Sequence, residues 1–371
     1  MYDILIIGGG LSGLTNAIVL ADAGLNVVLV EKNNYPFHRV CGEYISNEVK
    51  PFMKSIGADV EALNPANISE LIVSSPYGTT LNAKLDMGGF GVSRYKLDHF
   101  LYTIAIQKGC KIVTNTQVEE ITYSNPSFST ILSTGEIVTS NLVIGSYGKR
   151  SSLDRKLNRP FFHHPSPYIG VKYHIQTDFP KDKIALHNFK DGYCGMSAIE
   201  DDKYCLCYLT SRANLKNNGS IEAMENTVLK KNPFLKNVFN NSTFLYDKPE
   251  VINEISFEKK STSENHILMS GDTAGMIAPL CGNGMAMAIH SAKILSNCIK
   301  KNYKKNSINL ADITNDYTSQ WEKEFSKRLY IGKKIQHLFG RPILTEMVIQ
   351  TVKHIPPLKN WLIKQTHGSY L

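Results

Sequence analysis

The first thirty residues alternate between short apolar runs and glycine-rich or polar turns. The run DILII at 3–7 predicts a buried strand, because its apolar side chains cover both faces of an extended chain. Apolar residues then recur at helical spacing until Gly24 ends the predicted helix: Leu14, Ala17, Ile18 and Ala21. The run NVVLVE predicts a second buried strand that ends in Glu31. The pattern therefore predicts a strand, a turn, a helix and a second strand.

The turn between the first strand and the helix has the spacing G-x-G-x-x-G, at Gly8, Gly10 and Gly13. Glycines at these positions allow a tight turn and let a pyrophosphate approach the helix N-terminus, where free N–H groups and the helix dipole favour anions. Glu31 follows about 20 residues later, where an acid can hold ribose hydroxyls. Strand, turn, helix and acid together predict a dinucleotide-binding unit.

The alternation of strands and helices breaks after Glu31. Residues 33–57 predict a loop and an irregular helix, and residues 68–94 have the period-two pattern of strands separated by glycine and proline turns. A nicotinamide dehydrogenase would continue with alternating strands and helices, so the pattern favours FAD over NAD. Further strand-like segments between Pro160 and Glu258, such as YIGVKYHIQ and KYCLCYLTS, predict a sheet that roofs the flavin.

Four separated motifs resemble, in order, those of the FAD-dependent oxidoreductase superfamily of p-hydroxybenzoate hydroxylase, geranylgeranyl reductases and flavin-dependent halogenases. The first is the glycine turn with Glu31, and the second is the segment VSRYKLDHFLYTIAIQKGCKIVTNTQVEEI. The third is NLVIGSYGKRSSLDR, and the fourth is SGDTAGMIAPLCGNGMAMAIHSA, with the Gly-Asp pair of the family. The resemblance extends over nearly the whole chain and implies FAD as the cofactor.

The fourth motif is nearly uncharged and rich in glycine. HILMSGD predicts a strand that places Asp272 at its C-terminal end, where ligands of open α/β sheets bind. The resemblance implies that Asp272 accepts hydrogen bonds from the ribityl hydroxyls of FAD. It also implies that the helix from about Met285 points its N-terminus at the flavin, and that longer side chains at Gly282 or Gly284 would displace the ring.

The resemblance assigns the cofactor-binding residues one by one. Arg94 would contact FAD, and Val118 would present its backbone to the adenine. The full expected set is Gly8, Gly10, Leu11, Ser12, Gly13, Glu31, Lys32, Arg39, Cys41, Gly42, Arg94, Val118, Asp272, Gly282, Asn283, Gly284 and Met285.

Two segments bear on chemistry beyond cofactor binding. HRVCGEYIS resembles the Cys-Gly-Gly or Cys-Gly-Glu loop of prenyl reductases and some hydroxylases, which would place Arg39, Cys41 and Glu43 along the flavin. Cys41 and Glu43 are therefore the candidates for catalytic residues, although a buried cysteine is also a common apolar filler. The chain has Tyr147-Gly148 where the family usually has Asp-Gly, so the function of that acid for FAD or NAD(P)H is in question.

Composition and charge narrow the class of protein. The 371 residues are 42% hydrophobic and 20% charged, as in globular proteins. The odd count of seven cysteines and the expected absence of a signal peptide favour a cytoplasmic chain with reduced thiols. We expect no metal site, because no cysteine or histidine spacing matches a common zinc pattern. The net charge is +8, but no nucleic-acid module is present and none is expected as a partner.

Many of the basic residues lie in the C-terminal part, between Lys293 and Lys364. Trp321, Phe325 and Leu329 are spaced four apart, which predicts a helix that caps the core. The alternative is that this helix, with KKIQHLFGRP and PPLKNWLIKQ, rests on a membrane surface.

These observations predict an α/β fold in which a Rossmann-like, three-layer FAD-binding domain is interleaved with a mostly β substrate domain and followed by C-terminal helices. The expected FAD-binding domain comprises residues 1–65, 91–158 and 263–300. The expected substrate domain comprises 66–90 and 159–262, and the C-terminal helical region comprises 301–371.

Three functions remain open at this point. A flavoprotein monooxygenase that hydroxylates an aromatic or lipidic small molecule is favoured over a prenyl or geranylgeranyl-type double-bond reductase. The third is a non-catalytic flavin-binding sensor or carrier. Halogenation is disfavoured because the only tryptophans are Trp321 and Trp361, so the halogenase motif W-x-W-x-I-P is absent. NAD(P)H would bind transiently or a separate reductase would supply electrons, since no second glycine fingerprint occurs.

Overall fold

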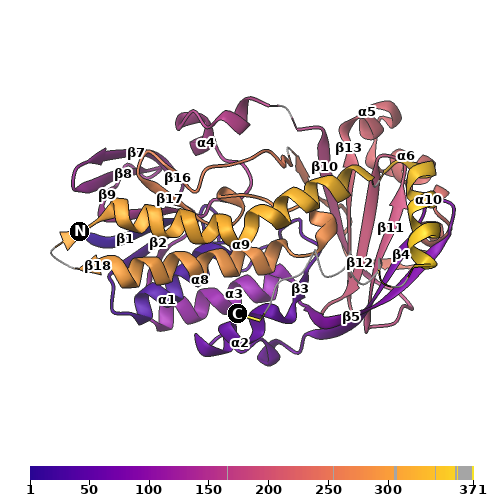
Figure 1. Cartoon of the computed structure of the whole chain (residues 1–371), viewed down its shortest axis with the longest axis horizontal. Helices are drawn as coiled ribbons and strands as arrows, with labels where there is room; N and C mark the ends of the chain where they lie inside the picture. Colours follow the sequence, from indigo (N-terminus) through magenta and orange to yellow (C-terminus); the bar gives the residue numbers. More distant parts are fainter. Residues whose placement is uncertain (165, 254, 305–306, 339, 356, 358–369) are drawn as a thin grey trace.

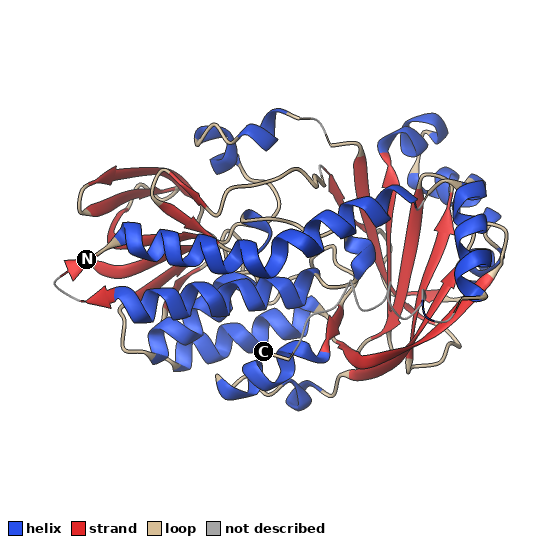
Figure 2. Cartoon of the chain, viewed as in Figure 1, coloured by secondary structure: helices blue, strands red, loops and turns tan. Residues whose placement is uncertain are grey.

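The structure of this chain is a computed structural model that describes residues 1–164, 166–253, 255–304, 307–338, 340–355, 357 and 370–371. Two large sheets lie at opposite ends of an elongated molecule, and long helices run along the first of them (Figure 1). Figure 2 shows the same division, with the strands gathered in two places and the long helices in front of the first sheet. The α/β class and the Rossmann-like unit predicted from the sequence are confirmed.

The first sheet is built around the N-terminal strand. Its strands lie in the order β16-β17-β9-β1-β2-β6, and β1 is parallel to both β2 and β9. The apolar runs recognised in the sequence form the buried centre, because parallel strands covered on both faces must be apolar throughout. The bounds are β1 Tyr2–Ile7, β2 Val27–Val30, β6 Lys111–Val113, β9 Ile137–Gly145, β16 Ser263–Glu264 and β17 Ile267–Met269, with the hairpin of β7 Val118–Ser124 and β8 Ser127–Leu132 attached to β9.

A layer of helices covers this sheet. Helix α1 packs between α3 and α8, and α9 packs on the outside of α8 (Figure 1). Trp321 and Phe325 of α9 are buried in the same core as β1, as predicted for a capping helix, and Leu329 packs against it. The helices are α1 Leu11–Asp22, α2 Lys50–Ser55, α3 Arg94–Gln107, α4 Ser152–Lys156, α8 Gly284–Asn302 and α9 Leu310–Leu338, and a short ribbon of β18 Tyr303–Lys304 and β19 Ser307–Ile308 joins the last two.

The second sheet is largely antiparallel. Its order is β14-β10-β13-β12-β11-β4-β5-β3, with β15 on β10, and β4 and β11 form a parallel pair. Strand β3 belongs here although its residues fall in the segment 1–65 assigned to the FAD-binding domain. The bounds are β3 Tyr44–Ser46, β4 Ala66–Ser74, β5 Thr80–Gly91, β10 Tyr168–Gln176, β11 Lys183–Phe189, β12 Gly192–Ala198, β13 Tyr204–Ser211, β14 Thr243–Phe244 and β15 Glu250–Asn253.

Helices on this sheet were not anticipated in a region predicted to be mostly β. Met224, Leu235 and Val238 pack against apolar residues of β10, β12 and β13, forming a second core. The helices are α5 Arg212–Asn218, α6 Ile221–Thr227 and α7 Pro233–Asn241, and α10 Pro342–Lys353 packs on β5 and β11. Within the described residues, no helix combines the length and the hydropathy needed to cross a membrane. Most of PPLKNWLIKQ lies outside the described residues, and membrane contact stays a prediction.

Candidate functional site: a dinucleotide and substrate cavity

The glycine turn between β1 and α1 has no room for side chains. Gly8 has φ +97°, and a Cβ there would lie 2.5 Å from the carbonyl oxygen of Ser146. A Cβ on Gly13 would lie 1.9 Å from the carbonyl oxygen of Gly8. Helix α1 begins after Gly10 without a side-chain cap or an acidic residue in its first turn. A backbone cradle at an uncapped helix N-terminus suits the pyrophosphate of a dinucleotide.

Glu31 follows β2 and is nearly buried, with 4% of its surface exposed. Its carboxylate accepts hydrogen bonds from the backbone N–H of Gly9 at 2.8 Å and of Asn33 at 3.1 Å. Arg39 approaches the same carboxylate, at 3.3 Å. The acid therefore joins the glycine turn to the loop after β2, at the edge of the site where a ribose would lie.

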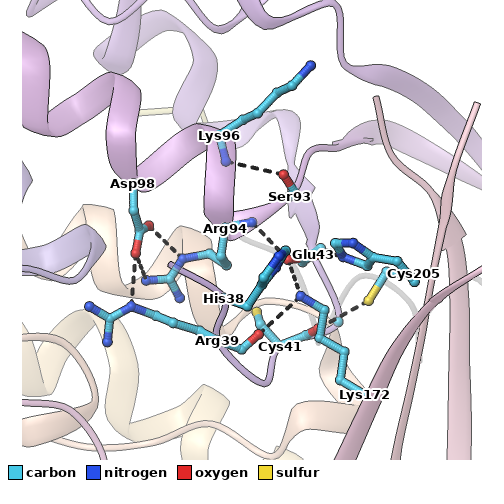
Figure 3. A network of polar contacts seen from close by, with 12 residues as sticks. His38, Arg39, Cys41, Glu43, Ser93, Arg94, Lys96, Asp98, Lys172 and Cys205 are labelled. Atoms are coloured by element: carbon cyan, nitrogen blue, oxygen red, sulfur yellow. Dashed lines mark hydrogen bonds and ion pairs between the residues drawn. The ribbon is translucent and has the colours of Figure 1, made fainter. Parts of the chain in front are cut away.

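Two arginines share a buried aspartate beside the glycine turn. Arg94 donates two hydrogen bonds to Asp98 one turn further along α3, at 2.7 and 2.8 Å, and Arg39 donates a third at 3.0 Å (Figure 3). Asp98 is fully buried, so this bidentate pair fixes the direction of both guanidinium groups. A Cβ on Gly10 would lie 3.7 Å from Arg94 Nη2, which places that arginine against the turn.

Asp272 lies in a short 3-10 turn, Gly271–Thr273, directly after β17. Burial raises the pKa of this carboxyl, whereas the nearby Lys260 lowers it. Lys260 is itself buried and donates from Nζ to the backbone carbonyl of Asp272 at 2.8 Å. Arg159, also buried, donates to the carbonyl of Thr273 at 3.0 Å. Two buried cations thus hold the backbone of the Gly-Asp motif, and the sequence analysis identified neither.

Tyr147 and Gly148 form a turn although the usual Asp of this motif is replaced by Tyr147. Gly148 has φ +87°, and its N–H donates to Thr273 Oγ1 at 2.9 Å. Tyr147 extends to Met269 on the neighbouring strand, with its hydroxyl 3.5 Å from the sulfur. The third motif is therefore tied to the Gly-Asp motif by a backbone contact, without an acid at position 147.

The second glycine turn leads into α8. Gly282 has φ +64°, the left-handed region that favours glycine. A Cβ on Gly284 would meet only Ile277, at 3.8 Å, so the protein itself leaves space there. Asn283 is buried, and its side-chain N–H donates to Glu48 Oε1 at 3.4 Å.

These turns border one cavity of about 1230 Å³ between the two sheets. Of the cofactor-binding residues predicted from sequence, Gly13 and Asn283 do not line it. Gly13 instead packs against the backbone of Gly8 in the turn. Those that do line it are Gly8, Gly10, Leu11, Ser12, Glu31, Lys32, Arg39, Cys41, Gly42, Arg94, Val118, Asp272, Gly282, Gly284 and Met285, together with the catalytic candidate Glu43.

The wall that the second sheet contributes to the cavity is mainly apolar. It includes Ile184, Leu186, Met196, Leu209 and Ile252. Apolar side chains at this end suit a hydrophobic ligand, since few polar groups there would lose their hydration when it binds.

Glu43 is the centre of a buried polar cluster that the sequence analysis largely missed. It accepts hydrogen bonds from Lys172 Nζ at 2.5 Å and from the backbone N–H of Arg94 at 2.8 Å (Figure 3). His174 lies 2.6 Å from the same carboxylate. Burial alone would raise its pKa, but Lys172 and His174 lower the pKa of Glu43 to about 2. Glu43 also has φ +54°, uncommon for a residue with a side chain.

This cluster could be mistaken for a metal site. Ligand atoms of Glu43, His174 and Cys205 lie within 4.8 Å of one another. The ammonium group of Lys172 already contacts Glu43, so a second cation would meet strong repulsion at the same carboxylate. Burial raises the pKa of Cys205 well above its ordinary value, which keeps the thiol protonated and a poor ligand.

Cys41, the other catalytic candidate, lines the cavity beside this cluster. Burial raises the pKa of its thiol, and its carbonyl oxygen accepts a hydrogen bond from the Cys205 thiol at 3.2 Å. A protonated thiol in this position acts as a small apolar wall residue rather than as a nucleophile.

A glycine-rich helix N-terminus, an acid after the second strand, a Gly-Asp turn and a cavity roofed by a separate sheet define a class of protein, the flavin-dependent oxidoreductases. The family model described as FAD binding domain matches residues 1–312. The chain belongs to this FAD-binding family.

Curated relatives have different activities. The chain is similar to digeranylgeranylglycerophospholipid reductase 2 of Methanothermobacter thermautotrophicus, 23% identical over 91% of this chain and 87% of that protein. It is also similar to the ubiquinone hydroxylase UbiM of Neisseria meningitidis, 22% identical over 99% of this chain and 84% of that protein. Among solved structures, the flavin-dependent brominase Bmp2 superimposes with a TM-score of 0.80 at 17% identity over 98% of this chain and 93% of that chain, a likeness of fold alone.

Proposed function

We propose that this chain is an FAD-dependent monooxygenase that hydroxylates an apolar aromatic or lipidic small molecule. The observation that carries the proposal is a continuous cavity that joins the dinucleotide turns of the first sheet to the apolar wall of the second. Electrons would come from transiently bound NAD(P)H or from a separate reductase. When bound, FAD would supply the redox chemistry and the activation of oxygen.

The residues of the chain would bind and orient the reactants. The turn at Gly8 and Gly13 would hold the pyrophosphate, Glu31 the ribose and Asp272 the ribityl hydroxyls. The N-terminus of α8 would stabilise negative charge on the reduced flavin through its dipole. The apolar wall at Ile184 would exclude water from the reaction.

A prenyl double-bond reductase is the second candidate. It is favoured by the reductase of Methanothermobacter thermautotrophicus, which matches this chain over most of both lengths. An apolar wall fits a prenyl chain as well as it fits an aromatic ring, so the two candidates differ in their use of oxygen. Halogenation is not proposed, because its tryptophan motif is absent from the sequence.

Oxygen use therefore separates the two candidates. FAD-loaded protein is mixed with NADPH, or with a flavodoxin or ferredoxin reductase system, and with a panel of phenols, quinol precursors and prenyl lipids. A hydroxylase consumes one oxygen molecule for each product, which gains one oxygen atom and no hydrogen. A reductase forms a product heavier by two hydrogens, equally well without oxygen. Asp272→Ala is the control. Formation of only the product heavier by two hydrogens, or of no product with any panel member, would contradict the proposed hydroxylation.

A further inference from the structure

A chain of hydrogen bonds leads from Glu43 back to the cavity through side chains from three segments. His174 Nε2 lies 2.6 Å from Glu43, and His174 Nδ1 lies 2.7 Å from the hydroxyl of Tyr246. That hydroxyl lies 3.0 Å from Nδ1 of His38. Glu43 and His174 are buried, Tyr246 is half-buried, and His38 lines the cavity.

The chemistry of Glu43 sets the direction of these bonds. An ionised carboxylate only accepts, so His174 must donate from Nε2. A neutral His174 then has a lone pair on Nδ1, which accepts the O–H of Tyr246. The oxygen of Tyr246 in turn accepts a hydrogen bond from Nδ1–H of His38. When His174 is neutral, these bonds therefore require the Nδ1–H tautomer of His38, which leaves the lone pair on Nε2, outside this chain of hydrogen bonds.

The two ends of this chain of hydrogen bonds, His38 and His174, have different environments. Among the described residues nothing bonds to Nε2 of His38, and the ring stacks on Tyr95 at a centroid distance of 4.7 Å. Burial, together with Lys172, lowers the pKa of His38, so this ring is a poor place for a proton to stay. At the other end, His174 Nε2 lies 2.6 Å from the negatively charged carboxylate of Glu43.

We propose that His38, Tyr246 and His174 form a proton relay that takes a proton from a ligand in the cavity and places it on His174. A weakly acidic O–H or N–H of the ligand would give its proton to His38 Nε2. His38 Nδ1–H would pass to Tyr246, and the O–H proton of Tyr246 would pass to His174 Nδ1. The ligand then carries the negative charge and His174 the positive charge, beside Glu43, so protons and charges balance.

The surroundings of the relay bear on its titration. Lys172 and the main-chain N–H of Arg94 neutralise part of the charge of Glu43, and Lys172 also lowers the pKa of His38. Glu250, opposite Lys172 in the strand pair of β10 and β15, favours protonation of His38. Cys205, opposite His174 on β13, is protonated and neutral. The relay needs the cavity but neither oxygen nor a particular flavin reaction.

Nitrogen-15 NMR of histidine-labelled, FAD-loaded protein tests the relay directly, with His38→Asn used to assign the signal. At about pH 8, where imidazoles are largely neutral, we expect His38 as the Nδ1–H tautomer, the less common form in solution. On lowering the pH to about 5, one proton should charge His174 and switch His38 to Nε2–H in a single shared transition.

Tyr246→Phe removes the hydroxyl that joins the two rings, so His38 should revert to Nε2–H and the shared transition should separate into two. Tyr330→Phe, an exposed tyrosine on α9, is the matched control and should leave the wild-type pattern intact. The relay is wrong if wild-type His38 is Nε2–H at both pH values, or if Tyr246→Phe leaves the titration unchanged. Neither readout depends on turnover, so failure of the relay is distinguishable from failure of the proposed function.

Discussion

At the scale of single residues, the site depends on glycines, which have no side chain, as much as on residues with side chains. Gly8 and Gly13 leave the space in which backbone N–H groups can approach a pyrophosphate, and their neighbours are backbone atoms that cannot move aside easily. Lys260 and Arg159 donate hydrogen bonds to backbone carbonyl oxygens of the Gly-Asp turn.

Gly13→Ala should destabilise the protein and weaken FAD binding. The new methyl group would lie 1.9 Å from the carbonyl oxygen of Gly8, and such overpacking costs about 1–3 kcal/mol or more. Thermal unfolding and FAD titration measure the two effects. Gly195→Ala is the matched control, since its methyl group would first meet an atom at 3.6 Å. Equal melting temperatures and FAD affinities in the Gly13 variant and the wild type would contradict the tight turn.

Lys260 should make stability depend on pH in the alkaline range. Burial lowers its pKa from 10.5 to about 8, so between these values the unfolded chain binds more protons than the folded chain. The free energy of unfolding contributed by this group should therefore rise with pH across that window, by about 3 kcal/mol. Urea unfolding of wild type and Lys260→Met between pH 7 and about pH 10.5 measures the difference. Lys300→Met, at an exposed position, should show no such trend, and a constant wild-type advantage over Lys260→Met would refute the assignment.

At the scale of elements, the loop of residues 39–43 is clamped between the two sheets. Glu43 reaches β10 through Lys172 and His174 and the start of α3 through the N–H of Arg94. Helix α9 contacts a different segment, because its Trp321 packs against Gly275 near the Gly-Asp turn.

Glu43→Gln should cost about 3–5 kcal/mol of unfolding free energy near neutral pH, because it leaves the buried Lys172 without its counter-charge. The folded pKa of about 2 lies below the ordinary 4.5, so the contribution of Glu43 is present above pH 4.5 and is lost as the pH falls through about 2. Denaturation of both proteins at a series of acidic pH values should show the difference shrinking. Glu61→Gln, in an exposed pair with Lys50, should cost less than about 1 kcal/mol. A Glu43→Gln penalty of that small size would contradict the clamp.

Phe325→Ala tests the capping role of α9. The ring is fully buried in the core that contains β1, and removal of such a ring costs about 3–5 kcal/mol. Tyr330→Ala, five residues later and 65% exposed, should change stability by less than about 0.5 kcal/mol. Similar small effects of both substitutions in chemical denaturation would indicate that α9 is not part of the core.

Interactions between residues that are close in the sequence could be predicted, whereas those between distant residues could not. The glycine turn and Glu31 are joined by short stretches of chain, so their spacing reveals them. Lys172 and His174 lie about 130 residues from Glu43, in a strand whose polar residues resemble an ordinary exposed face. Nothing local indicates that both faces of β10 are buried. Helices α5–α7 were missed because their short apolar stretches are interrupted by asparagine and lysine.

At the scale of the whole molecule, two sheets from interleaved segments meet at one cavity. The first sheet supplies the dinucleotide turns and the second supplies an apolar wall, so neither sheet has a complete site by itself. The central claim is that this shared cavity holds FAD between residues that are distant in sequence.

Calorimetric titration of the purified chain with FAD, followed by its visible spectrum, tests that claim most directly. The account predicts one FAD bound per chain, with the yellow absorbance of a protein-bound flavin, and much weaker binding in Asp272→Ala that still melts cooperatively. A folded wild-type chain that takes up no FAD, or an Asp272→Ala variant that binds it as tightly as the wild type, would contradict the account.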